Sequence, residues 1–345
     1  MDRSHFFYDL TPFVVMEAVE QAGLKPDGSS LQLNSLENRV YDLGMEDGSH
    51  VVAKFYRPGR WSREQIEEEH RFLALLAAEE IPVCAPLTLP AGGTIGEAEG
   101  IFFALWPRTG GRQTDEFSNE QLKMLGRYLG RIHLAGKSLK FQHRPKLDLH
   151  RMVIEPLEAI DKLEMEPHLK SRFSQLAREA GNKYDELSAS LTHQTLHGDC
   201  HVGNLLFNGE RCFFLDFDDA LSGPAVQDIW MLLGGDDYGQ RLEYLLEGYE
   251  TFLAFDRREL KLIEPLRALR MVYYAGWIAK RHDDPAFRHT FPHWGTREYW
   301  EQEIADLEKQ ISRFSKVDTV SYAHSINEGE KPVEEWTDSD YFFDM

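Results

Sequence analysis

A short β-hairpin expected at residues 205–215, with polar residues at both of its ends, constrains this chain more than any other feature. Two apolar stretches are separated by Asn208-Gly209, a pair that is typical of a tight hairpin turn. Because a hairpin brings its two ends together, the residue before it and the residue after it should lie side by side. These two residues are Asn204 and Asp216.

Both flanking runs are rich in groups that can do chemistry. The run before the hairpin is His197-Gly198-Asp199-Cys200-His201-Val202-Gly203-Asn204, and the run after it is Leu215-Asp216-Phe217-Asp218-Asp219. An Asp five residues before an Asn is typical of a phosphoryl-transfer loop, in which the Asp accepts the proton of the attacking hydroxyl and the Asn binds magnesium. Mg²⁺ takes its other ligands from phosphates and water. The pattern predicts Asp199 and Asp216 as catalytic residues, and Asn204 and Asp216 as metal ligands.

A zinc-dependent hydrolase site is the alternative interpretation of the first run. His197, Asp199 and His201 alternate along the chain, and on a strand all three side chains could bind zinc. The two glycines of the run favour a bent loop instead. A zinc site would also leave the residues at the two hairpin ends unexplained.

A lysine embedded in an apolar strand is the next expected part. The run Val51-Val52-Ala53-Lys54-Phe55-Tyr56 predicts a strand, and a Lys in such a run is costly to bury unless it is paired. In kinases this lysine neutralises the α- and β-phosphates and pairs with a glutamate of a helix. The alternative is an edge-strand lysine that points to water.

The helix that follows offers the glutamate. Apolar periodicity predicts a helix over residues 61–78 with Ser62 as its N-cap, and this helix contains three consecutive acids at 67–69. Three such acids usually form a solvated face, and only one needs to turn inward. We expect that one to be Glu69, which lies four residues before Leu73 and seven before Leu76, on the inward face.

Two further segments are candidates for nucleotide binding. Residues 33–43 predict a strand, a turn and a strand that could cover phosphates with backbone amides and the Ser35 hydroxyl, although the segment lacks a glycine-rich pattern. The apolar strand expected at 100–107 would run into a hinge that binds adenine near Leu105 and Trp106. A helix expected at 120–135 then begins a helical lobe.

This ordered set of residues resembles the aminoglycoside phosphotransferase and choline kinase superfamily, relatives of protein kinases with His-Gly-Asp in place of His-Arg-Asp. Longer strings are similar to the bacterial stress response kinases within it, among them Lys54-Phe55-Tyr56-Arg57-Pro58-Gly59-Arg60-Trp61 and Gly223-Pro224-Ala225-Val226-Gln227-Asp228-Ile229-Trp230. The resemblance extends over nearly the whole chain. The third residue of the metal motif, Asp218, departs from the Asp-Phe-Gly of protein kinases, so control by activation-loop phosphorylation is in doubt.

The resemblance implies an α+β, two-lobed protein-kinase-like fold. We expect a small β-rich N-lobe at 1–107, a larger and mainly helical C-lobe at 108–315, and an acidic extension at 316–345. The implied activity is that of an ATP- and Mg²⁺-dependent serine/threonine protein kinase of the stress response, which also phosphorylates itself. Within it, Asp199 is the catalytic Asp, Asn204 and Asp216 hold magnesium, and Lys54 and Glu69 anchor phosphate.

Other kinds of protein stay open as alternatives. A small-molecule kinase of the aminoglycoside, choline or homoserine kinase type would share the catalytic residues and differ in its substrate pocket. A non-catalytic nucleotide-binding scaffold is the other alternative. In either case ATP and Mg²⁺ are the expected ligands.

Composition limits the partners and the compartment. With 38 basic and 58 acidic residues the net charge is −20, which disfavours nucleic acid and an anionic membrane as partners. The chain has no long apolar run and no signal-peptide character at its start, so we expect a cytoplasmic protein, and we expect a monomer. Three cysteines without metal spacing suit a reducing compartment, and Cys200 is interpreted as a small buried residue.

One basic segment and one acidic residue have more than one interpretation. The basic run at 140–151 could contact an acidic substrate, or could be a solvated loop. Asp228 could pair with Arg267 or Arg270, or with the backbone near His197.

Overall fold

The protein has a mixed α+β fold, as the sequence predicts. The computed structural model describes residues 7, 9–114, 116–209, 211–235 and 238–317. The expected acidic extension lies outside the described residues from 318 onward. Within the described ranges, no helix is long and apolar enough to cross a membrane.

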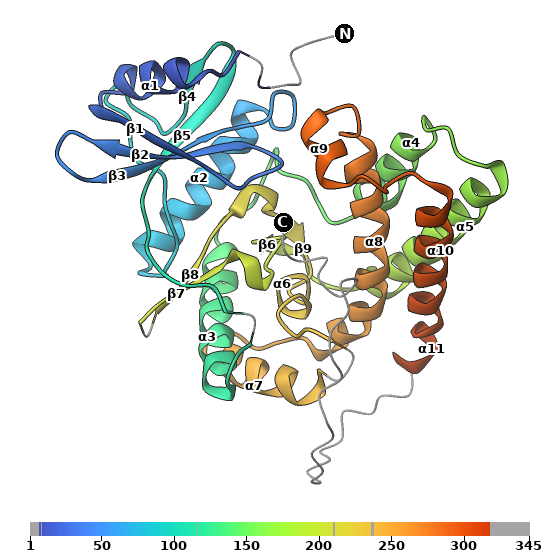
Figure 1. Cartoon of the computed structure of the whole chain (residues 1–345). Coiled ribbons are helices and arrows are strands. Elements are labelled where there is room, and N and C mark those ends of the chain that lie inside the picture. The colour runs from blue at the N-terminus through green and yellow to red at the C-terminus, as the bar shows by residue number, and fades with distance from the viewer. Residues whose placement is uncertain (1–6, 8, 115, 210, 236–237, 318–345) are drawn as a thin grey trace. The chain divides into compact units, whose positions relative to one another are not determined.

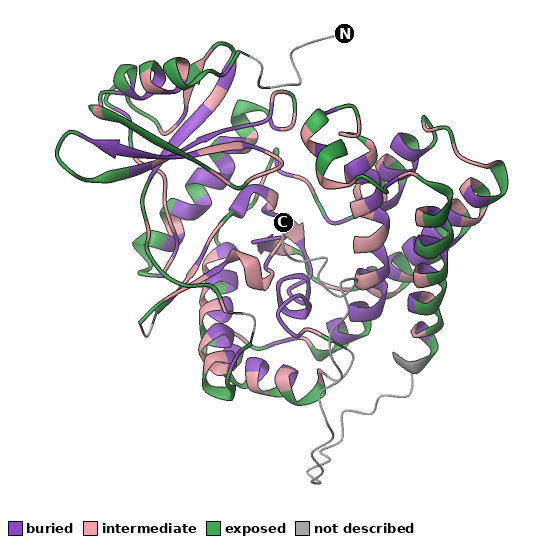
Figure 2. Cartoon of the chain, viewed as in Figure 1, coloured by how far each residue is buried: buried purple, intermediate pink, exposed green. Residues whose placement is uncertain are grey.

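A five-stranded antiparallel sheet forms the N-terminal part, with the strand order β1-β2-β3-β5-β4 (Figure 1). The first strand is exposed along most of its length, whereas the next two are mostly buried (Figure 2). The predicted strands at 33–43, 51–56 and 100–107 are present. The strand bounds are β1 Pro26–Leu33, β2 Arg39–Met45, β3 His50–Phe55, β4 Gly96–Ala98 and β5 Ile101–Pro107.

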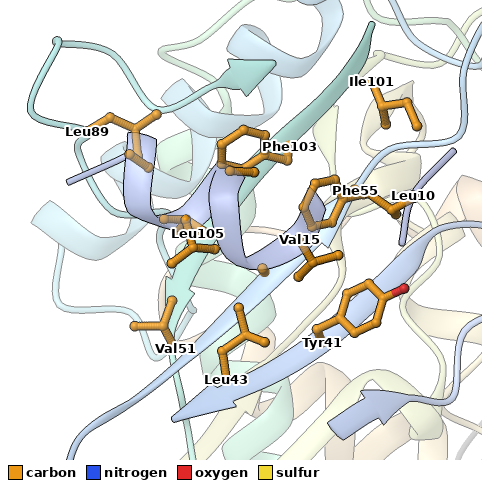
Figure 3. Close-up of a cluster of buried hydrophobic side chains, with 14 of the residues drawn as sticks. Leu10, Val15, Tyr41, Leu43, Val51, Phe55, Leu89, Ile101, Phe103 and Leu105 are labelled. Atoms are coloured by element: carbon orange, nitrogen blue, oxygen red, sulfur yellow. The ribbon is translucent and has the colours of Figure 1, made fainter. Parts of the chain in front are cut away.

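The two faces of this sheet have different partners, because alternate residues of a strand point to opposite faces. On one face Phe55 and Leu43 pack with Val15 of helix α1 (Pro12–Gln21) in an apolar core (Figure 3). The other face carries Tyr56 and Trp106 in a second apolar cluster. Lys54 lies one residue from Phe55, so it is on the second face, near the predicted glutamate helix.

Helix α2 (Arg63–Ala78) is that helix, and its start follows from local sequence. The Ser62 hydroxyl accepts the backbone N–H of Gln65, while the Gln65 side chain accepts the backbone N–H of Ser62. This reciprocal capping box satisfies two of the N–H groups that a helix start leaves without partners. The predicted N-cap is therefore confirmed.

The chain forms two compact units that each combine distant parts of the sequence. Among the described residues, the first unit comprises those up to Pro145 together with Gln194–Phe255, and the second comprises Lys146–His193 and residues 256–317. The expected lobe boundary at 107/108 falls inside the first unit and stays a prediction. All predicted site residues belong to the first unit.

The first unit also contains short strands and a tightly packed helix pair. Helices α3 and α7 approach closely because Gly126 has no side chain, and a Cβ there would overlap the Leu245 carbonyl. The predicted hairpin is formed by β7 and β8. The bounds of these elements are α3 Asn119–Gly136, β6 Gln194–Leu196, β7 Leu205–Asn208, β8 Arg211–Phe214, β9 Leu221–Gly223, α6 Gln227–Trp230 and α7 Gly239–Tyr249.

The second unit is helical and is built around one central helix. Helix α8 packs against α4, α5 and α10, and Trp300 is buried with its ring edge-to-face on Phe173 at 5.3 Å between centroids. Trp294 is buried beside it. The helix bounds are α4 Glu155–Ile160, α5 Pro167–Ser188, α8 Ile263–Ala279, α9 Pro285–Thr290, α10 Arg297–Ser312 and α11 Phe314–Val317.

Candidate active site

The hairpin brings its two ends together as expected. Strands β7 and β8 pair antiparallel with Leu205 opposite Phe214, and the Leu215 N–H donates to the Asn204 carbonyl at 2.9 Å. The Asn204 side-chain N–H₂ donates to the backbone carbonyl of Asp199 at 2.9 Å. The first polar run, called the catalytic loop (residues 197–204), is thereby connected to the second, called the metal loop (residues 215–219).

The catalytic loop is bent rather than extended. Gly198 has φ +89°, and a Cβ there would overlap the backbone carbonyl of Asp219. The buried His197 ring lies between backbone groups, with Nε2 at 2.7 Å from the Leu215 carbonyl and Nδ1 accepting the Asp199 N–H at 3.3 Å. This assigns the proton to Nε2. Since both ring nitrogens of His197 have backbone partners, the geometry does not support the zinc alternative.

Asp228 stabilises this bend through hydrogen bonds to the backbone of the loop. It is fully buried, and its two carboxylate oxygens accept the N–H groups of His197 and Gly198 at 2.8 Å each. Its Oδ2 also lies 3.0 Å from Nε2 of His133, whose Nδ1 lies 2.9 Å from the Tyr249 hydroxyl. Of the alternatives for Asp228, contact with the backbone near His197 is correct. The sequence gives no signal for His133, which contacts Asp228, or for Tyr249, which contacts His133, because these partners are distant along the chain.

The Asp199 carboxylate of the catalytic loop is partly exposed. Its Oδ2 lies 3.6 Å from Nε2 of His201, and the His201 Nδ1 accepts the Gly203 N–H at 3.0 Å. Cys200 is fully buried, and burial raises the pKa of its thiol well above the ordinary value. The interpretation of Cys200 as a small buried residue agrees with this environment.

The metal loop places two carboxylates in contrasting surroundings. Asp216 has φ +51° and ψ +70°, a left-handed conformation, and its side chain is 53% exposed. The Asp218 side chain is only 4% exposed and accepts the amide N–H₂ of Asn38 at 3.0 Å and a guanidinium N–H of Arg60. Burial alone would raise the pKa of Asp218, but the charges of Lys54 and Arg60 hold it well below its usual range.

Lys54 contacts both of these carboxylates. Its Nζ lies 3.2 Å from Asp216 Oδ1 and 3.1 Å from Asp218 Oδ1. Burial would lower the pKa of Lys54, but the charges of Asp216, Asp218 and Glu69 more than offset this and raise it. Lys54 is therefore a buried cation rather than an edge-strand lysine that points to water.

Glu69 turns inward as predicted, but so does its neighbour. Glu69 is buried, and its Oε2 lies 3.7 Å from Nη1 of Arg144, too far for a hydrogen bond. Burial raises the pKa of Glu69 to about 7. In this structure Lys54 forms ion pairs with the metal-loop carboxylates, so a direct Lys54–Glu69 pair stays a prediction.

The expectation that only one of the three acids turns inward is wrong. Glu68 is also buried, and its carboxylate accepts three consecutive backbone N–H groups, those of Gln142, His143 and Arg144, at 2.6, 2.9 and 2.8 Å. These hydrogen bonds explain how the carboxylate tolerates burial. Only Glu67 is exposed.

Lys140 and Lys146 in the basic run at 140–151 are exposed, as in a solvated loop, and contact of the run with an acidic substrate stays a prediction. Arg144 in the same run departs from both interpretations. Its guanidinium is buried, stacks over the Trp61 ring at 4.3 Å, and donates to the carbonyls of Ala220 at 2.9 Å and Phe217 at 3.3 Å. It also donates to the Asp218 carbonyl. Arg144 thus connects the metal loop to α2. No sequence signal separates this arginine from its exposed basic neighbours.

The turn between β1 and β2 is fixed by side chains. The half-buried Ser35 hydroxyl accepts the Asn38 N–H at 3.3 Å. The Arg57 guanidinium donates to the carbonyls of Leu36 at 3.1 Å and Glu37 at 3.0 Å. The predicted phosphate-covering turn therefore has a definite shape, although no glycine-rich pattern is present.

The two expected hinge residues differ in their surroundings. Leu105 points into the apolar core on the α1 face, and its backbone carbonyl already accepts the Leu87 N–H at 2.7 Å. The Trp106 ring is on the other face, with its centroid 5.8 Å from Nζ of Lys54. Trp106 is thus better placed to contact a nucleotide than Leu105, and adenine binding at either residue stays a prediction.

Comparison with other proteins identifies close sequence relatives. The chain matches the phosphotransferase enzyme family over residues 31–263. It is 42% identical over 322 residues to stress response kinase A of Escherichia coli strain K12, covering 90% of this chain and 95% of that protein. It is 40% identical over 320 residues, with the same coverage, to the serine/threonine protein kinase RdoA of Salmonella typhimurium. The resemblance to bacterial stress response kinases is confirmed.

Solved structures with this fold are more distant in sequence. Amicoumacin kinase hAmiN in complex with AMP-PNP, Ca²⁺ and Ami has a TM-score of 0.69 at 19% identity, covering 93% of this chain and 96% of that one. A microcompartment-associated aminopropanol kinase also has a TM-score of 0.69, at 16% identity, covering 91% and 100%. These similarities confirm the kinase-like α+β fold.

Proposed function

Because the chain belongs to the phosphotransferase enzyme family and is a kinase, we propose that it transfers the γ-phosphoryl group of ATP to Ser and Thr hydroxyls of proteins, including its own. One observation carries the proposal. The hairpin holds Asn204 against the start of the metal loop, and the catalytic loop before the hairpin leaves the Asp199 carboxylate partly exposed.

Asp199 is proposed to accept the proton of the attacking hydroxyl as the bond from that oxygen to the γ-phosphorus forms. The bond from the γ-phosphorus to the oxygen of ADP breaks in the same step, so that ADP is the leaving group. The Asp199 backbone is held at two points, by the Asn204 amide on its carbonyl and by the His197 ring on its N–H. A base fixed in this way loses little orientational freedom when the acceptor hydroxyl arrives. Nε2 of His201 lies 3.6 Å from the Asp199 carboxylate and borders it on one side.

The donor set of the two loops fits magnesium. The Asn204 amide and the Asp216 carboxylate are hard oxygen donors, and the Asp216 side chain is half exposed, so both suit a cation that keeps phosphate and water among its ligands. Bound there, Mg²⁺ would neutralise the charge that develops on the phosphates. Lys54, which stays cationic, is proposed to bind phosphate from the β3 side.

The assignment of protein substrates is supported by the relative RdoA, a serine/threonine protein kinase that is 40% identical to this chain. The proposal includes a role in a stress response, as in the stress response kinase A relatives, and action as a cytoplasmic monomer. Small-molecule phosphorylation is the second candidate, because both structural neighbours named above, an amicoumacin kinase and an aminopropanol kinase, are named for a small molecule.

Labelled phosphate transfer tests the proposal. The purified protein is incubated with γ-labelled ATP and Mg²⁺, first alone, then with a general protein substrate, and then with a panel of amino alcohols and aminoglycosides. We expect label on the protein itself and on the protein substrate, at acid-stable Ser and Thr. The rate of labelling should be far lower with Asp199→Asn. Label only on a small molecule would instead support the second candidate.

A further inference from the structure

Asn38, at the end of the turn between β1 and β2, is bonded to the metal loop although 180 residues separate the two in sequence. Its side chain is 3% exposed, and both ends of its amide are used. The Oδ1 accepts the Arg57 N–H at 3.1 Å, and the Nδ2 donates to Asp218 Oδ2 at 3.0 Å. One buried amide thus joins the predicted phosphate-covering turn to the loop that carries the predicted metal ligand Asp216.

Arg60 makes a second connection between the same two segments. Its guanidinium donates to Asp218 and, at 2.7 Å, to Asp219, and it lies 3.6 Å from the Glu37 carboxylate in the turn. Arg60 is only 11% exposed at its side chain. The turn and the metal loop are therefore joined by a hydrogen bond and by a buried ion pair that share the Asp218 carboxylate.

Asp218 is what makes these connections possible. It occupies the position at which protein kinases have glycine, and a glycine would offer neither Asn38 nor Arg60 a side-chain acceptor. Because Asp218 is two residues from Asp216, a displacement of the metal loop would move the acceptor away from both donors. Whether Asn38 and Arg60 are bonded to Asp218 therefore depends on the position of the predicted metal ligand Asp216.

We propose that Asn38 and Arg60 are positioning residues that couple the phosphate-covering turn to the metal loop, so that nucleotide and metal each strengthen the binding of the other. This inference rests on the proposed function, since it assigns nucleotide to the turn and Mg²⁺ to the metal loop. Such a coupling is reciprocal, and couplings of about 5–150-fold in affinity are typical.

The coupling is measured as a ratio of dissociation constants. Calorimetry gives the Kd of the full-length protein for ATP without and with Mg²⁺, and the quotient is the gain in affinity that the metal supplies. We expect Asn38→Ala to lower this gain by about 10-fold, while the Kd for ATP without metal changes by less than about 2-fold. In steady-state assays KM for ATP should rise and KM for the phosphate acceptor should not.

A second variant separates the contact with Asp218 from the contact that shapes the turn, since Asn38→Ala removes both. Asn38→Ser keeps a hydroxyl acceptor near the Arg57 N–H but removes the amide donor to Asp218, so it should also lose the gain. Arg60→Gln should reduce the gain, and Arg60→Lys should restore part of it by returning the charge beside Asp218. Arg63→Gln is the matched control, because Arg63 is an exposed arginine at the start of α2 that pairs with exposed Glu67, and it should leave the gain unchanged.

Two results would overturn the inference. An unchanged gain in Asn38→Ser, or equal losses of ATP affinity with and without Mg²⁺, would show that Asn38 only shapes the turn. In both cases the proposed function survives, because the unaltered protein still binds ATP with Mg²⁺. If the unaltered protein showed no Mg²⁺-dependent binding of ATP at all, the proposed function would fail, and the inference with it.

Discussion

The catalytic loop and the metal loop meet at the ends of one hairpin, yet they are held by different kinds of contact. Backbone N–H groups of the catalytic loop are bound by the buried Asp228 carboxylate, and His197 bridges two backbone segments. The metal loop is held by charged side chains, with Lys54 and Arg60 on its carboxylates and Arg144 on its carbonyls.

This difference indicates that the two loops respond differently to ligands. A bound cation or phosphate does not compete for the N–H groups that face Asp228 in the interior. By contrast, Mg²⁺ would compete with Lys54 for Asp216, and phosphate would compete with the carboxylates for Lys54. We therefore expect a catalytic loop that is formed in advance and a metal loop that rearranges its ion pairs when nucleotide binds.

The largest expected effect is on the catalytic rate, through Asp199, and does not involve the contacts that hold either loop. Asp199→Asn should lower kcat by about 10²–10⁴-fold, because it removes the proposed base and keeps the side chain's shape. ATP affinity and thermal stability should stay close to those of the unaltered protein, as measured by calorimetry and thermal unfolding. Near-normal turnover would remove Asp199 from the role of base.

The second largest expected effect is on stability, through Asp228, which holds the catalytic loop. Asp228→Ala leaves the N–H groups of His197 and Gly198 and the His133 ring without their acceptor in the interior. We expect a loss of about 2–5 kcal/mol in the free energy of unfolding, measured by urea denaturation, since each buried donor without a partner costs about 1–3 kcal/mol. A loss below about 1 kcal/mol would mean that water replaces the carboxylate, and the contrast between the loops would weaken.

A third comparison lies within the metal loop. Asp216→Ala should abolish the contribution of Mg²⁺ to ATP binding, a loss of at least about 10-fold, or about 1.4 kcal/mol. Asp218→Ala should reduce this contribution without abolishing it, because Asp218 is turned inward and is proposed to position the loop, through Asn38 and Arg60, rather than to bind metal. Calorimetric titration with ATP and Mg²⁺ measures both, and equal losses would show that both carboxylates coordinate the metal.

The smallest effects concern Lys54 of strand β3 and Glu69 of helix α2, two buried charged residues near the metal loop. Lys54→Ala and Glu69→Ala should each lower kcat, and the double variant should be little worse than either one, with a coupling energy of about 1–2 kcal/mol. Glu67→Ala is the control, because Glu67 is exposed, and it should change stability by less than about 0.5 kcal/mol. Additive effects of Lys54 and Glu69 would mean that they do not act as one pair.

Much of this arrangement could be predicted because it depends on local pattern. The Asn-Gly turn predicts the hairpin, and the hairpin alone requires Asn204 and the start of the metal loop to be neighbours. Helical periodicity is enough to turn Glu69 inward. In each case the signal lies within about one element, where residue spacing determines direction.

What could not be predicted depends on contacts between distant segments. Glu68 is one step from Glu69 on the helix, and only the three N–H groups of a loop more than seventy residues away explain its burial. Arg144 and Asn38 have no local pattern that distinguishes them from surface residues. Their partners become visible only when the chain is folded. The sequence alone therefore predicted which side chains lie together at the hairpin ends better than it predicted the residues that support them.

Gly198 has a consequence for how such loops can evolve. A single mutation to arginine would produce the His-Arg-Asp of protein kinases, but at φ +89° the new side chain would be strained and its Cβ would overlap the Asp219 carbonyl. The substitution is open only to a chain whose metal loop has already taken another path. A side chain at position 198 therefore requires a shift of the backbone at Asp219, so the sequence of the catalytic loop is constrained by the path of the metal loop.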